Sequence, residues 1–486
     1  MTVPPFSLES LPRIEFAAEP GLAELYEFAW KLAYDHIREC PGAPQTPYMD
    51  EGFSPDRIWI WDTCFMVNFC KYAPQLFPGA VSLDNFYRPL LDGVKSPLQI
   101  QHPDNPPLLA WAEAANYQVT GDRNRIRRIL IEKRYLQRYF EWVERLKSGQ
   151  TVPGGIVSIG LERTPFGYRW SGTPSGMDNT PRGGVAADEH NLAQYRQIYW
   201  VDALAQQALS AEIIARLAED CGLHVDAEFF QSRYQELKML LNTYYYDAED
   251  GFYYDIATEP PFRPCKVKTP ASYWAMLAGV CSPEQAAAMV RQATDPQCFG
   301  GDYPWPSVSR SDPAFNPAGE YWRGGVWLPM AYLGTKALER YGYYAEADQL
   351  AYRVVMQQFR TWRDFEPHTI WEAYSPTADR PSTDKAIIDA AKPVRPDFCG
   401  WSALGPICLM IENVLGIAAD GIANRLHWRV NRSCRNGISN LQFGGNRVDL
   451  QYDGDGALFI RAEKPFTLQV DGEEYAIAAG KTRLHN

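Results

Sequence analysis

Two acidic side chains in loops rich in aromatic residues and proline are the best candidates for chemistry in this sequence. Asp178 lies in WSGTPSGMDNTPR (170–182), and Glu372 lies in HTIWEAYSP (368–376). Cleavage of an acetal needs one carboxyl group to protonate the leaving oxygen and a second to activate water or attack carbon. Aromatic neighbours keep water away from such groups and favour the protonated acid. The pattern therefore indicates a pair of carboxyl groups in a cleft that binds sugars.

Each of the two carboxylates also has a structural interpretation. Asp178 is predicted to lie on a turn, where an aspartate commonly forms an Asx-turn or caps a helix. A carboxylate between tryptophan and tyrosine is costly unless it is paired or used, so Glu372 could instead form an ion pair with Arg380 or Arg395. Glu366 is a nearby competitor for the catalytic role.

Two further segments place a charged residue beside tryptophan. Asp62 ends RIWIWD (57–62) and precedes a predicted helix, so it is either an N-cap or a carboxylate that binds two sugar hydroxyls beside a stacking indole. Arg323 lies in YWRGGVW (321–327), which is predicted to open a helix. Its permanent charge suits it to orient a catalytic carboxylate or bind hydroxyls, and the alternative is a buried ion pair.

The elements that must position these residues are mainly helices. Apolar residues recur at three- and four-residue spacing and predict twelve helices, at 21–39, 62–75, 82–94, 107–119, 124–147, 190–219, 226–245, 269–279, 284–293, 321–341, 344–360 and 400–416. Long loops separate many of them, as is typical of binding and catalytic segments. Twelve helices with such loops between alternate pairs fit a double ring of six inner and six outer helices, an (α/α)6 barrel over 1–420.

The spacing of apolar residues changes near residue 421. Short segments with period-2 alternation follow at 424–430, 438–443, 446–452, 457–462, 467–470 and 474–478. Glycine and Asp-Gly turns separate them, which is typical of antiparallel strands. We therefore predict a small domain over 421–486 that resembles a β-sandwich.

Composition limits the partners. The 47 Lys+Arg and 59 Asp+Glu give a net charge of −12, which disfavours nucleic acid and anionic membranes. The N-terminus has no signal-peptide pattern, and the ten cysteines are scattered without CxxC spacing, so we expect free thiols in a reducing cytoplasm. HExxH, GxxxxGK[ST], GxGxxG and GxSxG patterns are absent from the sequence, and we expect neither a metal site nor a cofactor.

Seven segments, taken in order, resemble glycoside hydrolase family 63 and its trehalase-like relatives. They are WD (61–62), PPLLAWA (106–112), SGMDNTPR (175–182), GFYYD (251–255), YWRGGVW (321–327), WEAYSP (371–376) and GWSAL (400–404). A single WD pair would be a weak signal, whereas seven segments in the right order are a strong one. The resemblance covers roughly residues 50–416.

The resemblance implies an (α/α)6 barrel and an inverting mechanism, with Asp178 as general acid and Glu372 as general base. Inverting pairs stand roughly 6.5–9.5 Å apart so that a water molecule fits between them. Aromatic faces would bind the apolar side of the sugar while polar groups fix its hydroxyls. We predict substrate contacts from Trp61, Asp62, Asn105, Trp111, Arg182, Trp322, Arg323, Trp371, Tyr374 and Trp401.

The sequence departs from the family pattern in places. Asn105 stands where the family often has glutamine before the Pro-Pro pair, and WSGTP (170–174) comes between the expected elements of the acid motif. The chain is short for the long-chain processing glucosidases of the family. Hydrolases of short α-glucosides, or of α-mannosyl and α-glucosyl glycerate, are closer in size.

The leading hypothesis is an exo-acting α-glycosidase that removes one α-linked hexose, with glucose as the first choice, from a small acceptor. A trehalase is the nearest rival, and GDYPW (301–305) is similar to a trehalase loop. A sugar epimerase would need paired histidines and no role for Asp178. A carbohydrate-binding protein without catalysis would not need both carboxylates. The sequence leaves the oligomeric state open.

Overall fold

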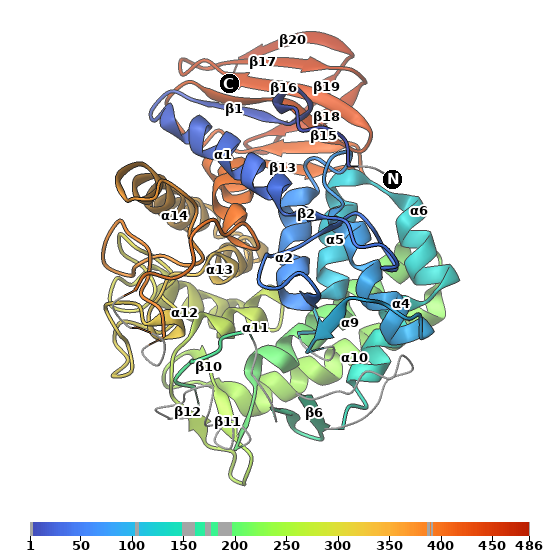
Figure 1. Cartoon of the computed structure of the whole chain (residues 1–486), viewed down its shortest axis with the longest axis vertical. Helices are drawn as coiled ribbons and strands as arrows, with labels where there is room; N and C mark the ends of the chain where they lie inside the picture. Colours follow the sequence, from blue (N-terminus) through green and yellow to red (C-terminus); the bar gives the residue numbers. More distant parts are fainter. Residues whose placement is uncertain are drawn as a thin grey trace.

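The computed structural model describes residues 3–102, 106–147, 161–170, 176–182, 197–385, 389 and 392–485. Helices of the first four-fifths of the chain form one body, and a stack of antiparallel strands lies at one end of it (Figure 1). The main helices are α1 (Gly21–Asp35), α2 (Ile60–Cys70), α4 (Asp84–Asp92), α5 (Leu109–Thr120), α7 (Tyr135–Val143), α9 (Val201–Asp220), α10 (His224–Leu240), α11 (Tyr273–Leu277), α12 (Pro283–Thr294), α13 (Leu328–Arg340), α14 (Tyr344–Asp364) and a π-helix (Gly405–Val414).

Each predicted helical region contains helix within the described residues. The region 124–147 is broken: α6 (Arg123–Ile126) runs into a π-helix (Arg127–Glu132), and α7 begins after Arg134, whose φ is 51°. A left-handed residue interrupts the hydrogen-bond pattern there, which apolar spacing does not reveal. None of the described helices is both long enough and apolar enough to cross a membrane.

The helices differ in how far they are buried. Every residue of α2 is buried, and so is every residue of the π-helix Gly405–Val414. Helix α10, which packs along α9, instead buries one stripe formed by Ala227, Phe230, Tyr234 and Leu237. A helix that is apolar on all sides lies inside, and an amphipathic helix covers it from outside. The helical body therefore has an inner and an outer layer.

The C-terminal strands form two sheets. One has the order β1-β15-β16-β17-β20 and the other β13-β14-β18-β19. Their bounds are β1 (Arg13–Phe16), β13 (Ile417–Asp420), β14 (Arg425–Trp428), β15 (Asn436–Phe443), β16 (Asn446–Tyr452), β17 (Ala457–Ala462), β18 (Phe466–Val470), β19 (Glu473–Ile477) and β20 (Gly480–His485). The rings of Phe443 and Phe466 lie 5.6 Å apart between the two sheets. The six predicted strands are confirmed as antiparallel-sheet strands, with one parallel pairing between β14 and β18.

The sequence did not reveal that the N-terminal segment belongs to this sheet. Strand β1 pairs antiparallel with β15, with Phe16 opposite Asn436. Figure 1 shows the N-terminal strand and α1 lying against the C-terminal sheets. The two ends of the described chain thus share one sheet, and they join it to the helical body.

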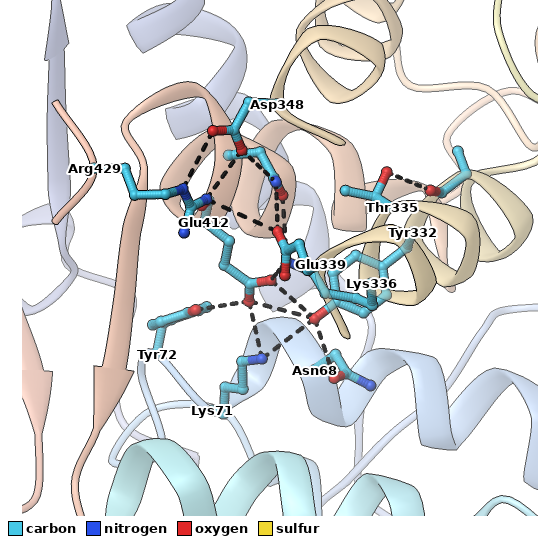
Figure 2. A network of polar contacts seen from close by, with 12 residues as sticks. Asn68, Lys71, Tyr72, Tyr332, Thr335, Lys336, Glu339, Asp348, Glu412 and Arg429 are labelled. Carbon is cyan, nitrogen blue, oxygen red and sulfur yellow. Dashed lines mark hydrogen bonds and ion pairs between the residues drawn. The ribbon is translucent and has the colours of Figure 1, made fainter. Parts of the chain in front are cut away.

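Four buried polar residues and one partly exposed lysine connect the helices near these sheets (Figure 2). We call them the Glu412 cluster: Lys71, Tyr72, Tyr332, Lys336 and Glu412. Lys71 Nζ lies 2.9 Å and Lys336 Nζ 2.7 Å from the Glu412 carboxylate, and the hydroxyls of Tyr72 and Tyr332 donate to it at 2.7 and 3.1 Å. Burial alone would raise the pKa of Glu412, but the two lysine charges outweigh it and lower the pKa to about 2.

Candidate active site

A cavity of about 330 Å³ lies among the loops of the helical body. Five of the predicted site residues line it: Trp61, Asp62, Asp178, Trp322 and Trp401. The volume is in the range of sites that bind small molecules, and the mixture of indole faces with carboxylates suits a sugar ring. Residues predicted from segments more than 300 positions apart therefore meet at one hollow.

The loop that carries Asp178 is fixed by its neighbours. Gly176 has a φ of 79°, and a Cβ there would lie 3.0 Å from the Trp61 indole, so the loop can approach the ring closely only with glycine. The side chain of Asn179 accepts from the Trp322 N–H at 2.8 Å and donates to Glu320 O at 3.0 Å. These contacts hold Asp178 between two of the indoles that line the cavity.

Glu372 lies behind the cavity wall and is only 4% exposed. The Tyr321 hydroxyl donates to its Oε1 at 2.8 Å, and the Arg395 N–H donates to Oε2 at 3.3 Å. Burial raises the pKa of Glu372 to about 7, although the Tyr321 hydrogen bond and the Arg395 charge oppose the rise. A carboxyl group that titrates near neutral pH can exchange a proton with water under ordinary conditions.

The structural alternatives considered for Glu372 find little support. The Arg395 guanidinium lies over the Phe53 ring at 4.1 Å, and the hydrogen bond of Arg395 to Glu372 comes from its backbone. The competitor Glu366 is on the surface, where it pairs with His368 at 2.9 Å. Glu372 is thus the better placed of the two glutamates.

A chain of contacts joins the two carboxylates. Lys385 Nζ lies 2.9 Å from Asp178 Oδ2 and 4.7 Å above the Tyr321 ring, and Tyr321 in turn donates to Glu372. The charge of Asp178 also raises the pKa of Glu372, and both charges raise that of Tyr321. Asp178 and Glu372 are therefore neighbours across Tyr321.

The YWRGGVW segment forms a short 3-10 helix (Tyr321–Arg323) that is separate from α13, rather than the first turn of one continuous helix over 321–341. Glu320 and Tyr321 have φ values of 41° and 61°, and α13 begins only at Leu328. Left-handed conformations cost non-glycine residues free energy and concentrate at functional sites. The Trp327 Nε1–H donates to Tyr321 O at 3.1 Å, and Trp327 stacks on Trp322 at 4.0 Å. The turn brings the Tyr321 hydroxyl to Glu372.

Asp62 is in the first turn of α2, and Trp59 occupies the N-cap, so the predicted capping role is wrong. Its Oδ1 is buried without a hydrogen-bond partner among the described residues, as are both carboxylate oxygens of the nearby Glu51. Burial raises the pKa of Asp62 well above its usual range, and the charges of Glu372 and Asp178 add to the rise. Unpartnered polar atoms beside a cavity suit a site that ligand hydroxyls complete.

Arg182 was predicted to contact the substrate, but it is part of a buried ion triad instead. Its buried guanidinium binds Asp202 at 2.6 Å and Asp255 at 2.7 Å, and it lies 4.3 Å over the Trp200 ring. Because Asp255 ends the GFYYD segment, the two motifs are joined by this ion triad. The triad ties the acid loop to α9 and β11 (Asp255–Ala257), and Arg182 is not among the residues that line the cavity.

The remaining predicted contacts that the structure describes are not among the residues that line the cavity. Trp111 packs edge-on against Phe65 and Trp274 in the core. The Tyr374 hydroxyl accepts from the Trp371 N–H at 3.2 Å, and both side chains are buried. Arg323 lies 3.9 Å from Glu320. Asn105 lies outside the described residues.

The site predicted from sequence left out eight lining residues, namely Phe53, Ser54, Arg57, Trp59, His102, Pro106, Gly176 and Tyr321. Arg57 and Trp59 belong to β4 (Arg57–Trp59), which pairs in parallel with β5 (Gln99–Gln101) to form one wall. Tyr321 stood inside a motif that carried the resemblance and Trp59 lies two residues before another, so their aromatic character was an available signal. Arg57 had no such signal, because only the pairing of two distant strands brings it to the cavity.

Comparison with known proteins decides the family. Residues 95–386 match the family described as mannosylglycerate hydrolase MGH1-like glycoside hydrolase domain. The chain belongs to this family. The matched segment contains both Asp178 and Glu372, and the resemblance to glycoside hydrolase family 63 is confirmed.

The chain is also similar to individual proteins in sequence or in fold. An uncharacterised protein of Borreliella burgdorferi is 26% identical over 418 residues, which cover 81% of this chain and 79% of the relative. The mannosylglycerate hydrolase of Thermus thermophilus in complex with Tris is 18% identical with a TM-score of 0.57, over 79% of this chain and 99% of the other. A sialidase structure matches 98% of this chain with a TM-score of 0.69 and 15% identity, but this chain spans only 41% of it. The protein is a glycoside hydrolase of the MGH1-like family with a mainly helical fold.

Proposed function

We propose that this chain is an exo-acting, inverting α-glycosidase that removes one terminal α-linked hexose from a small acceptor, with Asp178 as general acid and Glu372 as general base. The observation that carries the proposal is the meeting of these two carboxylates around Tyr321 at a cavity lined by four tryptophans. Inverting hydrolysis needs two carboxyl groups on opposite sides of the scissile bond. Their origin in separate loops suits that arrangement.

Glu372 is suited to the role of base. With a pKa of about 7 a substantial fraction is ionised at neutral pH, and burial makes that carboxylate basic enough to take a proton from water. The Tyr321 hydroxyl holds Oε1 at 2.8 Å, while the contact of Oε2 with the Arg395 N–H is longer, at 3.3 Å. Oε2 is therefore the oxygen that we expect to accept the proton of the attacking water.

Asp178 is suited to the role of acid by position, because it faces the cavity and is 30% exposed. Lys385 Nζ lies 2.9 Å from Asp178 Oδ2 and holds the carboxyl group at a defined place beside the cavity.

The sugar would bind against Trp61, Trp322 and Trp401, with Asp62 taking its hydroxyls. Arg57 brings a positive charge to the lining, which favours an acidic acceptor such as glycerate over a second glucose unit. The GDYPW segment does not support the trehalase hypothesis, because Trp305 is fully buried and packs on Gly334. Among the described lining residues His102 is the single histidine, whereas an epimerase would need a pair.

We also propose that the two helical layers form an (α/α)6 double ring over residues 1–420, with the sheets of 421–486 as a separate unit to which β1 is added. A cytoplasmic location stays a prediction from the pattern of cysteines.

The test is hydrolysis by the purified protein of matched pairs of α-glucosides and α-mannosides with glycerate, glycerol or glucose as acceptor. We expect release of one hexose from at least one α-linked compound and none from the β-linked controls. Turnover of β-linked compounds alone, or of none of the panel, would contradict the proposal.

A further inference from the structure

A carboxyl group that the proposed mechanism does not use lies directly behind the cavity wall. Glu51 is 0% exposed, and neither of its carboxylate oxygens has a hydrogen-bond partner among the described residues. Phe53 and Ser54, which follow it closely in the chain, line the cavity. A Cβ at Gly400 would lie 3.1 Å from the Glu51 Cβ, and the next residue, Trp401, lines the cavity as well. Glu51 is thus next to the site but closed off from it.

Asp62 is a second carboxyl group with an unsatisfied oxygen at this place. It lines the cavity, yet its Oδ1 is buried and has no partner among the described residues. After burial, the charge of Asp62 is the largest cause of the raised pKa of Glu51, so the two groups are close to each other. A carboxylate that is withdrawn from water without a partner is costly, and such a group takes up a proton instead.

The other charged groups around Glu51 do little to neutralise it. Arg395 opposes the rise in the pKa of Glu51, but the side chain of Arg395 is exposed, so solvent and salt screen its charge. Asp50 adds a negative charge, which Arg38 balances only from 3.6 Å. Burial lowers the pKa of His36, so this ring is neutral at neutral pH. The surroundings therefore disfavour an ionised Glu51 beside a second ionised carboxylate.

The fold favours Glu51 over Asp62 as the group that keeps the proton. Asp62 is in the first turn of α2, where the partial positive charge of the helix N-terminus favours an anion. It also lines the cavity, where ligand hydroxyls can donate to it. Glu51 has neither advantage, because it lies in a segment without helix and is closed off from the cavity. A proton on Glu51 also supplies the donor that Asp62 Oδ1 lacks.

We propose that Glu51 is a positioning residue that carries a proton and holds Asp62 ionised and oriented as the acceptor of the sugar's hydroxyls; the inference rests on the proposed function. The Glu51 carboxyl group donates to the buried Oδ1 of Asp62, and Oδ2 accepts from the sugar. The pair then carries one negative charge instead of two. A second charge would repel the ionised form of Glu372, which the base needs. No bond is formed or broken by Glu51.

Infrared difference spectroscopy of the full chain at pH 8 tests the proton on Glu51 without reference to activity. A protonated carboxyl group and an ionised carboxylate absorb in separate stretching regions. The difference between the wild-type protein and Glu51→Gln should show the C=O band of a protonated acid. Glu412→Gln is the matched control, because Glu412 is also buried but has a pKa of about 2, so its difference spectrum should show carboxylate bands. Carboxylate bands for Glu51 as well would overturn the inference.

The role of that proton in sugar binding is tested by kcat/KM for α-glucosyl and α-mannosyl fluoride, which need no acceptor group. Glu51→Leu removes the donor and should lower kcat/KM for the fluoride that is cleaved by roughly 10- to 100-fold, the range of one hydrogen bond to a charged group. Glu51→Gln, an uncharged donor of the same size, should recover most of that loss. In the Asp62→Asn protein, Glu51→Leu should cost much less, because the carboxylate that it serves is gone.

Each other outcome counts against the pair. A Glu51→Gln enzyme as impaired as Glu51→Leu would show that Glu51 acts through a negative charge. A loss from Glu51→Leu that is undiminished in Asp62→Asn would show that Glu51 acts on packing alone. Either result, or full activity of Glu51→Leu on the fluorides, would overturn the inference and leave the proposed function standing. A wild-type enzyme that hydrolyses no α-hexoside or fluoride would contradict the proposed function and the sugar-binding role together, whereas the infrared spectra would still decide which group holds the proton.

Discussion

Two buried glutamates in different parts of the helical body have pKa values shifted in opposite directions. Glu372 and Glu412 are 4% and 6% exposed, yet the pKa of the first is raised to about 7 and that of the second is lowered to about 2. Burial acts in the same direction on both. Glu412 has two lysines within 3 Å, whereas Glu372 has one tyrosine hydroxyl and a backbone N–H.

The difference between the two pKa values indicates a different role for each region. In the Glu412 cluster every charge has a partner, so the carboxylate stays ionised and helps to hold the inner helices together (Figure 2). Around Glu372 the structure leaves a carboxyl group poorly neutralised and leaves atoms of Glu51 and Asp62 without partners among the described residues. Such a site is less stable than it could be and is free to exchange a proton, which is common where chemistry takes place.

The largest effect should come from removing either carboxylate of the active site. Asp178→Asn and Glu372→Gln should each lower kcat/KM for the natural type of substrate by roughly 10³-fold or more, because acid and base catalysis are each worth several powers of ten. With a glycosyl fluoride, Asp178→Asn should recover most of its rate and Glu372→Gln should not. Steady-state kinetics on both substrates checks this, and a recovery in Glu372→Gln alone would reverse the two roles.

The free energy of unfolding should depend on Glu412 rather than on Glu372, the reverse of what we expect for activity. Glu412→Gln removes the carboxylate that Lys71 contacts at 2.9 Å and leaves Lys336 with Glu339 alone, and it should cost about 3–5 kcal/mol of unfolding free energy. Glu372→Gln should leave stability at pH 8 unchanged or higher. Denaturant unfolding of both variants measures the two free energies. A Glu372→Gln protein that unfolds as readily as Glu412→Gln would contradict this prediction.

Glu412 and Glu372 should make the free energy of unfolding change with pH in opposite directions. The pKa of Glu412 lies below its usual 4.5 at about 2, so the stability it contributes, on the order of 3 kcal/mol, is present above pH 4.5 and is lost as the pH falls toward 2. The pKa of Glu372 lies above 4.5, so its contribution is full below that pH and is lost as the pH rises through about 7.

A smaller effect should follow from removing the Tyr321 hydroxyl. The Tyr321 hydrogen bond lowers the pKa of Glu372 against the effect of burial, so Tyr321→Phe should raise that pKa further. The acidic limb of the kcat/KM profile, expected near pH 7 in the wild-type enzyme, should move up by roughly one pH unit. A uniform loss of activity with an unshifted limb would show that Tyr321 matters only for packing.

The sequence predicted most of the elements because helix and strand periodicities are local. It also identified both catalytic candidates, since carboxylates between aromatic residues in a loop are unusual. It placed Arg182 wrongly, because its partners Asp202 and Asp255 meet it only after folding. Lys385 was missed for the same reason, because its approach to Asp178 joins segments more than 200 residues apart and has no pattern of its own.

The central claim, that Asp178 and Glu372 act as an inverting pair, is tested most directly by the configuration of the first sugar released. Proton NMR recorded in the first minutes of hydrolysis of an α-linked substrate should show the β anomer, before mutarotation mixes the two forms. An α anomer as first product would require a nucleophile on the enzyme and would contradict the assignment of Glu372 as a base.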